Sequence, residues 1–237
     1  MRGARILVFG ASGAIGGSVV QQARALGWSV TAVTRGSVSR AWDPSVAWRS
    51  WDVMNIESAD AVASDEPFDA VCWAQGANLS DSLLHFETDR HLELYNTNVL
   101  YVLRSAAALV SGRLLRETGA RLVVVSSIWQ ERARGDKLSY TVTKSAIGGL
   151  VRSASVDLGV SGHLINAVLP GVLDTPMTRS NLTAEQVAAV SGKTTLGRLP
   201  DLDTLVQTIL FLCSRDNKAI SGQSITVDLG MSNVNLV

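Results

Sequence analysis

Seven short runs rich in β-branched and other apolar residues recur along the chain, separated by stretches with helical patterning. The runs span residues 5–10, 28–34, 46–53, 68–74, 120–127, 163–170 and 224–230. Strands that alternate with helices lie parallel in one sheet, and the helices cover both of its faces. We therefore predict a doubly wound α/β fold with a seven-stranded parallel sheet. The length of 237 residues allows one large core, so we expect a single domain over residues 1–237.

The segment from 87 to 117 is the longest stretch with helical periodicity, and no proline interrupts it. Its apolar residues, among them Leu92, Val99, Leu103 and Leu109, follow a spacing close to 3.6. This pattern predicts one long helix with a buried stripe.

The stretch 176–200 is more polar than its surroundings and lies between Pro176 and Pro200. A polar segment bounded by prolines is typical of an insertion on the surface. We interpret it as a mobile lid over a substrate site.

Charge and hydropathy narrow the classes of partner. Lysine plus arginine and aspartate plus glutamate both number 21, so the balanced charge argues against nucleic acid or an anionic membrane surface as a partner. A small-molecule substrate is favoured instead. No apolar run approaches the roughly 18 residues of a membrane span, and the N-terminus lacks a signal-peptide cleavage site. We expect a soluble, cytoplasmic protein.

The cysteines and histidines do not predict a metal site. Cys72 and Cys213 lie far apart in apolar runs, without metal-ligand or disulfide spacing, and indicate buried thiols in a reducing compartment. His85, His91 and His163 are scattered and have no partner at ligand spacing. We assign no metal.

A glycine-rich segment, GASGAIGG at 10–17, follows the first predicted strand. Glycines at a strand-to-helix turn let the backbone approach a pyrophosphate, whose charge is bound by the free amides of the helix N-terminus. The same glycines could serve only to pack the helix on the strand. This segment by itself leaves both interpretations open.

Tyr140 and Lys144 lie four residues apart, and therefore on one face, where a helix is predicted to begin. A free phenol has a pKa of about 10 and is a poor base at neutral pH. A cation held nearby stabilises the phenolate and lowers the pKa toward the working range. The pair could therefore carry acid–base chemistry, with incidental surface chemistry as the alternative.

These motifs resemble those of the short-chain dehydrogenase/reductase family, whose members have a Rossmann fold. The first turn is similar to the family's T-G-x-x-x-G-x-G loop, with Phe9 in place of its threonine and Ala14 in place of its middle glycine. The resemblance implies that the cofactor contacts Gly10, Ser12, Gly13, Ala14, Ile15 and Gly16.

Three further segments resemble cofactor-binding elements of that family. WDV at 51–53 implies that Asp52 accepts a hydrogen bond from the adenine and that the backbone of Val53 contacts the ring. WAQG at 73–76 stands where the family has N-N-A-G, with Ala74, Gln75 and Gly76 near the ribose. PGVLDT at 170–175 resembles P-G-x-x-x-T, and implies that Pro170, Gly171, Val172 and Thr175 position the nicotinamide.

The family's catalytic tetrad is present in order as Asn98, Ser127, Tyr140 and Lys144. The resemblance implies that Tyr140 exchanges a proton with a carbonyl oxygen or a hydroxyl and that Ser127 hydrogen-bonds the same oxygen. Lys144 would assist Tyr140, and Asn98 would hold a water that connects Lys144 to solvent. By the same resemblance, Asn98, Tyr140 and Lys144 also contact the cofactor. Each residue alone has a simple structural explanation, but the four together favour the catalytic one.

The end of the second predicted strand indicates which nicotinamide cofactor is used. Members that bind NAD usually place an acid there for the ribose hydroxyls, whereas this chain has Thr34 followed by Arg35. An arginine can pair with a 2′-phosphate, so we predict NADP(H) in preference to NAD(H). The alternative for Arg35 is a solvated surface arginine.

The segments expected to form the substrate pocket match the family's motifs less well than the cofactor-binding segments do. Trp129 lies two residues after Ser127, where it could line a substrate pocket or anchor a loop. In the charged segment 130–137, Arg132 or Arg134 could meet an acidic substrate, although such loops are usually only solvated.

The function expected from these motifs is an NADP(H)-dependent interconversion of a carbonyl and a secondary alcohol. The resemblance also implies a homo-oligomer, a dimer or a tetramer, built through the long fifth and sixth helices. Two alternatives stay open: a non-catalytic NADP-binding regulator or scaffold, and an enzyme like a sugar-nucleotide epimerase or dehydratase.

Overall fold

The computed structural model describes residues 3–37, 43–55, 59–63, 66–175, 178–179 and 182–234. Within them, seven parallel strands form one sheet in the order β3-β2-β1-β4-β5-β6-β7. The strands are β1 (Arg5–Phe9), β2 (Ser29–Thr34), β3 (Ala47–Ser50), β4 (Ala70–Trp73), β5 (Arg121–Val125), β6 (Leu164–Pro170) and β7 (Ser224–Val227). The predicted fold class and all seven predicted strands are confirmed.

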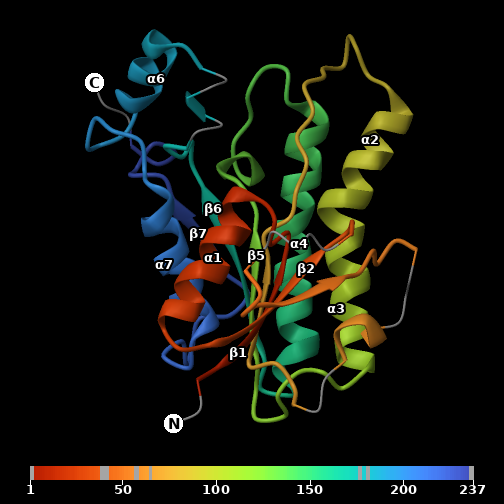
Figure 1. Cartoon of the computed structure of the whole chain (residues 1–237). Coiled ribbons are helices and arrows are strands. Elements are labelled where there is room, and N and C mark those ends of the chain that lie inside the picture. The colour runs from red at the N-terminus through yellow and green to blue at the C-terminus, as the bar shows by residue number, and fades with distance from the viewer. Residues whose placement is uncertain are drawn as a thin grey trace.

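Helices cover both faces of the sheet, as Figure 1 shows. Helices α1 (Ala14–Ala25) and α7 (Leu202–Cys213) pack together on one face. On the other face lie α2 (Thr88–Tyr95), α3 (Tyr101–Ser111) and α4 (Leu138–Gly159). The shorter helices are the 3₁₀ turns η1 (Ala59–Val62) and η3 (Ile128–Gln130), the π-helical turn η2 (Asn96–Leu100), and α6 (Ala184–Ser191).

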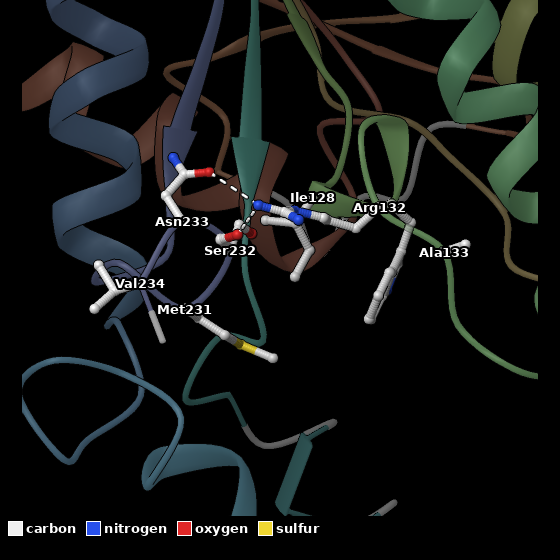
Figure 2. Close-up of a pocket in the computed structure, with 8 residues that line it drawn as sticks. Ile128, Arg132, Ala133, Met231, Ser232, Asn233 and Val234 are labelled. Carbon is white, nitrogen blue, oxygen red and sulfur yellow. Dashed lines mark hydrogen bonds between the residues drawn. The ribbon is translucent and has the colours of Figure 1, made fainter. Parts of the chain in front are cut away.

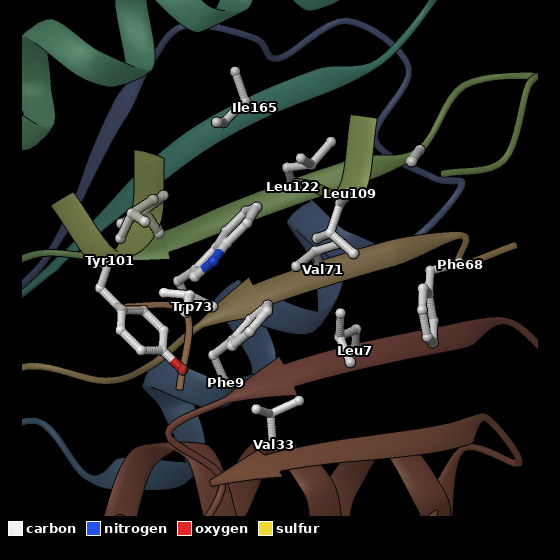
Figure 3. Close-up of a cluster of buried hydrophobic side chains, with 14 of the residues drawn as sticks. Leu7, Phe9, Val33, Phe68, Val71, Trp73, Tyr101, Leu109, Leu122 and Ile165 are labelled. Atoms are coloured by element: carbon white, nitrogen blue, oxygen red, sulfur yellow. The ribbon is translucent and has the colours of Figure 1, made fainter. Parts of the chain in front are cut away.

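The central strands are buried on both faces because apolar residues occupy most of their positions. In β1, Leu7 and Phe9 point into the core under α3 and α4, whereas Ile6 and Val8 point into the core under α1 and α7. Figure 3 shows the first of these cores, where Phe9 lies beside both Trp73 and Tyr101. The ring of Phe9 stacks at 5.7 Å on Trp73 and meets the edge of Tyr101 at 5.9 Å. Phe9 is therefore a core residue.

The predicted long helix at 87–117 forms, but it is neither uniform nor buried along its whole stripe. It runs through α2, η2 and α3 and ends at Ser111. Leu92 is 51% exposed and Leu103 is 44% exposed, so the expectation that both are buried is wrong. The π-helical turn inserts an extra residue per turn and shifts the face that a 3.6 period predicts.

The predicted lid at 176–200 contains α6, whose N-cap Thr183 forms a capping box with Gln186. At the other end, Leu199 and Pro200 are buried. Residues 176–177 and 180–181, with the predicted boundary Pro176, lie outside the described residues. The mobility of this segment stays a prediction.

Parallel strands bring their carboxyl ends to one edge of the sheet. The segments that follow β1, β4, β5 and β6 therefore meet at that edge. These are the segments that contain the glycine-rich turn, WAQG, Ser127 and PGVLDT. In open α/β sheets this edge is where ligands bind.

Candidate active site

The glycine-rich turn is tightly packed against neighbouring backbone. Gly10 has a φ of +69°, and a Cβ there would lie 2.5 Å from the backbone nitrogen of Gln75. A Cβ on Gly16 would lie 2.3 Å from the carbonyl oxygen of Gly10, so Gly16 does pack the helix on the strand. Helix α1 begins after Gly13, which provides no side-chain cap. The first-turn amides of α1 remain available to an anion.

A cavity of about 340 Å³ opens beside this turn. Its wall includes Gly10, Ser12 and Gly13 from the turn, Arg35 directly after β2, and Gln75 and Gly76 after β4. Both polar atoms of the Gln75 amide are buried and make no hydrogen bond to a described residue. Burying an amide without partners is unfavourable, and a bound polar group would satisfy it. The cavity therefore fits the ribose and phosphates of a dinucleotide.

Asp52 and Val53 are not part of the wall of this cavity. The carboxylate of Asp52 accepts hydrogen bonds from Met54 N at 3.1 Å and from Asn55 Nδ2 at 2.8 Å, and the side chain of Val53 is fully buried. The predicted contact of Asp52 with adenine stays a prediction.

Tyr101 is a wall residue that sequence reasoning missed. Its hydroxyl donates to the carbonyl of Trp51 at 3.1 Å, and its burial is the main reason that its pKa is raised. The available signal was its position three residues after Asn98, on the same face of the helix.

Tyr140 and Lys144 face each other in the first turns of α4. The ammonium nitrogen of Lys144 lies 5.7 Å from the centroid of the Tyr140 ring and donates to the carbonyl of Val125 at 3.3 Å. Lys144 is 4% exposed, and its burial lowers its pKa to about 8. Burial also raises the pKa of Tyr140, while a hydrogen bond with Ser127 acts in the opposite direction.

These two effects on the pKa of Tyr140, burial and the hydrogen bond with Ser127, differ from the expectation that Lys144 lowers this pKa. Both groups are withdrawn from water, and desolvation disfavours the charged form of each. The ammonium group also lies over the ring face, and Ser127 is the residue that hydrogen-bonds the phenol. The structure therefore places Ser127, Tyr140 and Lys144 together, and burial raises the pKa of the phenol more than the hydrogen bond with Ser127 lowers it.

Asn98 lies in the π-helical turn η2 and is 3% exposed. Its side chain accepts from Ala77 N at 2.8 Å and donates to Ala77 O and to Thr143 Oγ1, both at 3.1 Å. A Cβ on Gly76 would lie 3.5 Å from Asn98 Oδ1 and 3.4 Å from Lys144 Nζ. Asn98 thus joins the segment after β4 to α4 beside the ammonium group of Lys144.

Ser127 and Trp129 form the start of the segment after β5. Ser127 is the N-cap of η3, and its hydroxyl accepts from the backbone nitrogen of Trp129 at 3.3 Å. Trp129 lines two cavities of about 450 Å³ each. We name them the C-terminal cavity, which includes Met231 and Val234, and the α6 cavity, which includes Val172 and Val190.

Figure 2 shows the C-terminal cavity, with Arg132 extending across it. The guanidinium group of Arg132 donates to the carbonyl of Ser232 and to Asn233 Oδ1. These bonds hold the segment after η3 against the C-terminal segment.

The segment after β6 follows the predicted path. Gly171 donates to the carbonyl of Val227 at 3.0 Å, which extends the pairing of Pro170 with Val227. Val172 lines the α6 cavity. The hydroxyl of Thr175 accepts from Thr178 N at 3.2 Å and lies 3.1 Å from the Thr178 hydroxyl, so it stabilises its own turn.

A second group of residues that sequence reasoning missed fastens the loop after β4 to the start of α4. Asp81 is buried and accepts from both the backbone nitrogen and the hydroxyl of Ser139. His91 Nδ1 lies 2.8 Å from that hydroxyl and must donate to it, because the hydroxyl proton goes to Asp81. Lys137 donates to Asn78 Oδ1 and to two oxygens of residues 79–80. Contacts over such sequence separations leave no local signal.

Among the described residues, no cluster of three or more histidine, cysteine or acidic residues could hold a metal ion. No helix in the described part of the chain is long and apolar enough to cross a membrane. Both cysteines are buried and unpaired.

The sequence matches a family model over residues 10–232, which is nearly the whole chain. The model is described as enoyl-(acyl carrier protein) reductase. Together with the fold and the order of its site residues, this match shows that the chain belongs to the short-chain dehydrogenase/reductase family of oxidoreductases.

Relatives align along their full lengths. The chain is 26% identical to a 3-oxoacyl-(acyl-carrier-protein) reductase of Vibrio harveyi, with 98% of each chain covered. It is 29% identical to an L-xylulose reductase of Cavia porcellus, with 97% of each covered. A solved structure of ElxO with NADP bound superposes with a TM-score of 0.84 at 21% identity, over 98% of this chain and 99% of that one.

Proposed function

We propose that the protein interconverts a carbonyl compound and a secondary alcohol, with NADP(H) as the hydride carrier. The observation that carries this proposal is the convergence of Ser127, Tyr140, Lys144 and Asn98 at the carboxyl edge of the sheet. The cavity beside the glycine-rich turn lies at the same edge. A sensor or scaffold would need the cavity but not the acid–base residues.

The bound nicotinamide would supply or accept the hydride at the carbonyl carbon. During reduction, Tyr140 Oη gives its proton to the carbonyl oxygen, and Ser127 Oγ donates a hydrogen bond to the same oxygen. The ammonium group of Lys144, whose pKa of about 8 lies near the working pH, can then return a proton to the phenolate of Tyr140. Asn98 holds the backbone beside Lys144 in place through Ala77 and Thr143.

The preference for NADP(H) rests on Arg35. This arginine lines the cavity next to Thr34, and no aspartate or glutamate is among the described residues of its wall. A 2′-phosphate would pair with the guanidinium group, whereas NAD lacks that charge. NADP in the ElxO structure, which has the same fold, is consistent with this proposal.

We also propose that residues 1–237 act as one catalytic unit that assembles into a homo-oligomer, most simply a tetramer, in the cytoplasm. Exposed apolar side chains on α2, α3 and α4 support the assembly: Leu92 is 51% exposed, Val156 is 73% exposed and the adjoining Val160 is 90% exposed. Such a face could pack against a second copy. Light scattering coupled to gel filtration would measure the mass.

The test of function is oxidation of NADPH, followed at its absorbance band, with a panel of ketones, sugars and acyl thioesters. Tyr140→Phe should lower turnover by at least about a hundredfold, the usual contribution of a general acid. The variant should still bind NADPH, because the phenol hydroxyl is not needed to form the cavity. Cofactor binding without turnover of any substrate class by the wild-type protein would favour the sensor, and full activity of Tyr140→Phe would refute the assigned mechanism.

A further inference from the structure

We infer that the carbonyl substrate carries an anionic group, a carboxylate or a phosphate ester, which Arg134 and Lys193 bind at the α6 cavity. This inference rests on the proposed function, because it describes the substrate side of the same site. The charged segment after η3 and the segment around α6 would form this anion site, and neither shows a family pattern in the sequence.

The position of the α6 cavity ties it to the site. One wall contains Trp129, which is two residues from Ser127, and another contains Val172, which follows β6 at the carboxyl edge of the sheet. Leu182, Val190 and Met231 add an apolar surface. A molecule in this cavity would therefore lie between the serine that hydrogen-bonds Tyr140 and the lid segment.

The charges of this cavity have one sign. Its polar side chains are Arg134, Gln186 and Lys193, and no acidic residue is among the described residues that line it. Neither Arg134 nor Lys193 has a side-chain hydrogen bond or ion pair with another described residue. Glu131 and Asp136 belong to the same loop as Arg134 but line neither cavity. Two cations that line one cavity and have no side-chain partner among the described residues are suited to a ligand with a negative charge.

Two neighbouring cations help to define the role of Arg134. Arg132 is bonded to Ser232 and Asn233 and so holds the C-terminal segment in place. Lys137 is bonded to the loop at 78–80, and repulsion from Arg134 is one of the causes, after burial, that lower its pKa. Arg134 is thus the cation of this loop that is left for a ligand, and an anion would also relieve its repulsion with Lys137.

The occupant should combine the anion with an apolar portion. The apolar wall formed by Trp129 and Val190 would cover a short carbon chain, and Gln186 can donate to a carboxylate or phosphate oxygen. The reaction balances as in the proposed function: NADPH and a proton convert the anionic ketone to the hydroxy compound and NADP⁺. The anionic group itself does not react.

The test uses ketones that end in a carboxylate or in a phosphate, each paired with a neutral methyl ester or alcohol of the same chain length. The KM should be lower for the anionic member of each pair and should rise with ionic strength, while the KM of the neutral member stays constant. Arg134→Gln and Lys193→Gln should each raise the KM of the anionic ketone roughly fivefold, as expected for a pair still exposed to water. Both should leave the neutral ketone unaffected, and Lys218→Gln, an exposed cation in the loop before β7, should change neither.

Direct binding separates this inference from the proposed function. Calorimetric titration of Tyr140→Phe with the same pairs, in the presence of NADP⁺, measures binding without turnover. Tighter binding of the anionic member that is lost in Arg134→Gln supports the inference even if no ketone is reduced. Equal binding of charged and neutral members, or an equal effect of the variants on both, overturns it. A preference for phosphate over carboxylate would identify the source of the charge.

Discussion

The ammonium nitrogen of Lys144 lies 5.7 Å from the centroid of the Tyr140 ring, in a position where the lysine is almost fully buried. A buried ammonium group is unfavourable for folding unless its surroundings replace the lost water. Here the contact that we identify is one carbonyl, Val125 O, at 3.3 Å, together with the ring face. The position of Lys144 is therefore unfavourable for stability, and the proposed role in proton transfer would explain why a lysine stands there.

Lys144→Met should make the protein more stable at neutral pH and inactive. The folded pKa of Lys144 is about 8, against a reference value of 10.5. Below the folded pKa the charged lysine carries its full burial penalty. Between the two values the unfolded chain holds a proton that the folded one has lost, so the free energy of unfolding rises with pH across this window.

Lys144→Met should raise the free energy of unfolding by roughly 2 to 3 kcal/mol at pH 7, and this increase should vanish above about pH 10.5. Urea unfolding of both proteins at several pH values measures the difference. The exposed Lys193→Met, as a control, should show no such dependence. A variant that is less stable than the wild type at pH 7 would show that the contacts of Lys144 outweigh its burial.

Arg35→Ala should weaken binding of NADP⁺ by about tenfold to a hundredfold, the range of a charge-assisted contact to phosphate. Binding of NAD⁺ should change by less than about twofold, since it has no 2′-phosphate for the arginine to pair with. Fluorescence titration with both cofactors gives the two dissociation constants. Arg49→Ala, in the adjacent strand β3 and outside the cavity wall, is the matched control. If Arg35→Ala weakened the binding of NADP⁺ and NAD⁺ equally, Arg35 would not be the residue that distinguishes the two cofactors.

Asn98→Ala should lower the free energy of unfolding by about 2 to 3 kcal/mol, because three hydrogen bonds of a buried side chain are lost. The free energy is measured by urea unfolding. Asn96→Ala, in the same π-helical turn, tests whether the loss belongs to the contacts or to the turn. We expect a much smaller change for Asn96→Ala, and similar losses in both variants would contradict the role given to Asn98.

Ser139→Ala should destabilise the protein by about 1 to 3 kcal/mol, because Asp81 and His91 both lose the hydroxyl that connects them. Hydrogen exchange should also increase in the loop at 78–81, which this hydroxyl fastens to α4. Mass spectrometry of peptides from that loop measures the exchange. Ser153→Ala, at an exposed position of the same helix, should leave both quantities unchanged. Unaltered exchange in Ser139→Ala would mean that Lys137 and the backbone nitrogen of Ser139 hold the loop without the hydroxyl.

The sequence predicted the sheet correctly because burial on both faces imposes a local pattern. A strand such as β1 must be apolar at its buried positions, 6–9, and Gly10 must follow it where the backbone turns with a positive φ. The spacing of Ser127, Tyr140 and Lys144 is likewise short, and one strand, one turn and one helix bring them together. Local periodicity failed for Leu92 and Leu103, where a π-helical turn lies between them and changes the face.

The amino-acid sequence by itself determined the order of strands and helices along the chain, the turn beside which a dinucleotide would lie, and the order of the residues proposed for acid–base chemistry. Only the tertiary structure decided which of the charged residues after η3 form hydrogen bonds with other segments and which line a cavity. Arg132 is bonded to residues a hundred positions away, whereas Arg134 shares a cavity with Lys193. The physical reason is that hydrophobic periodicity can be recognised from residues that are close in the sequence. The partner of a charged residue depends on segments that only the folded chain brings together.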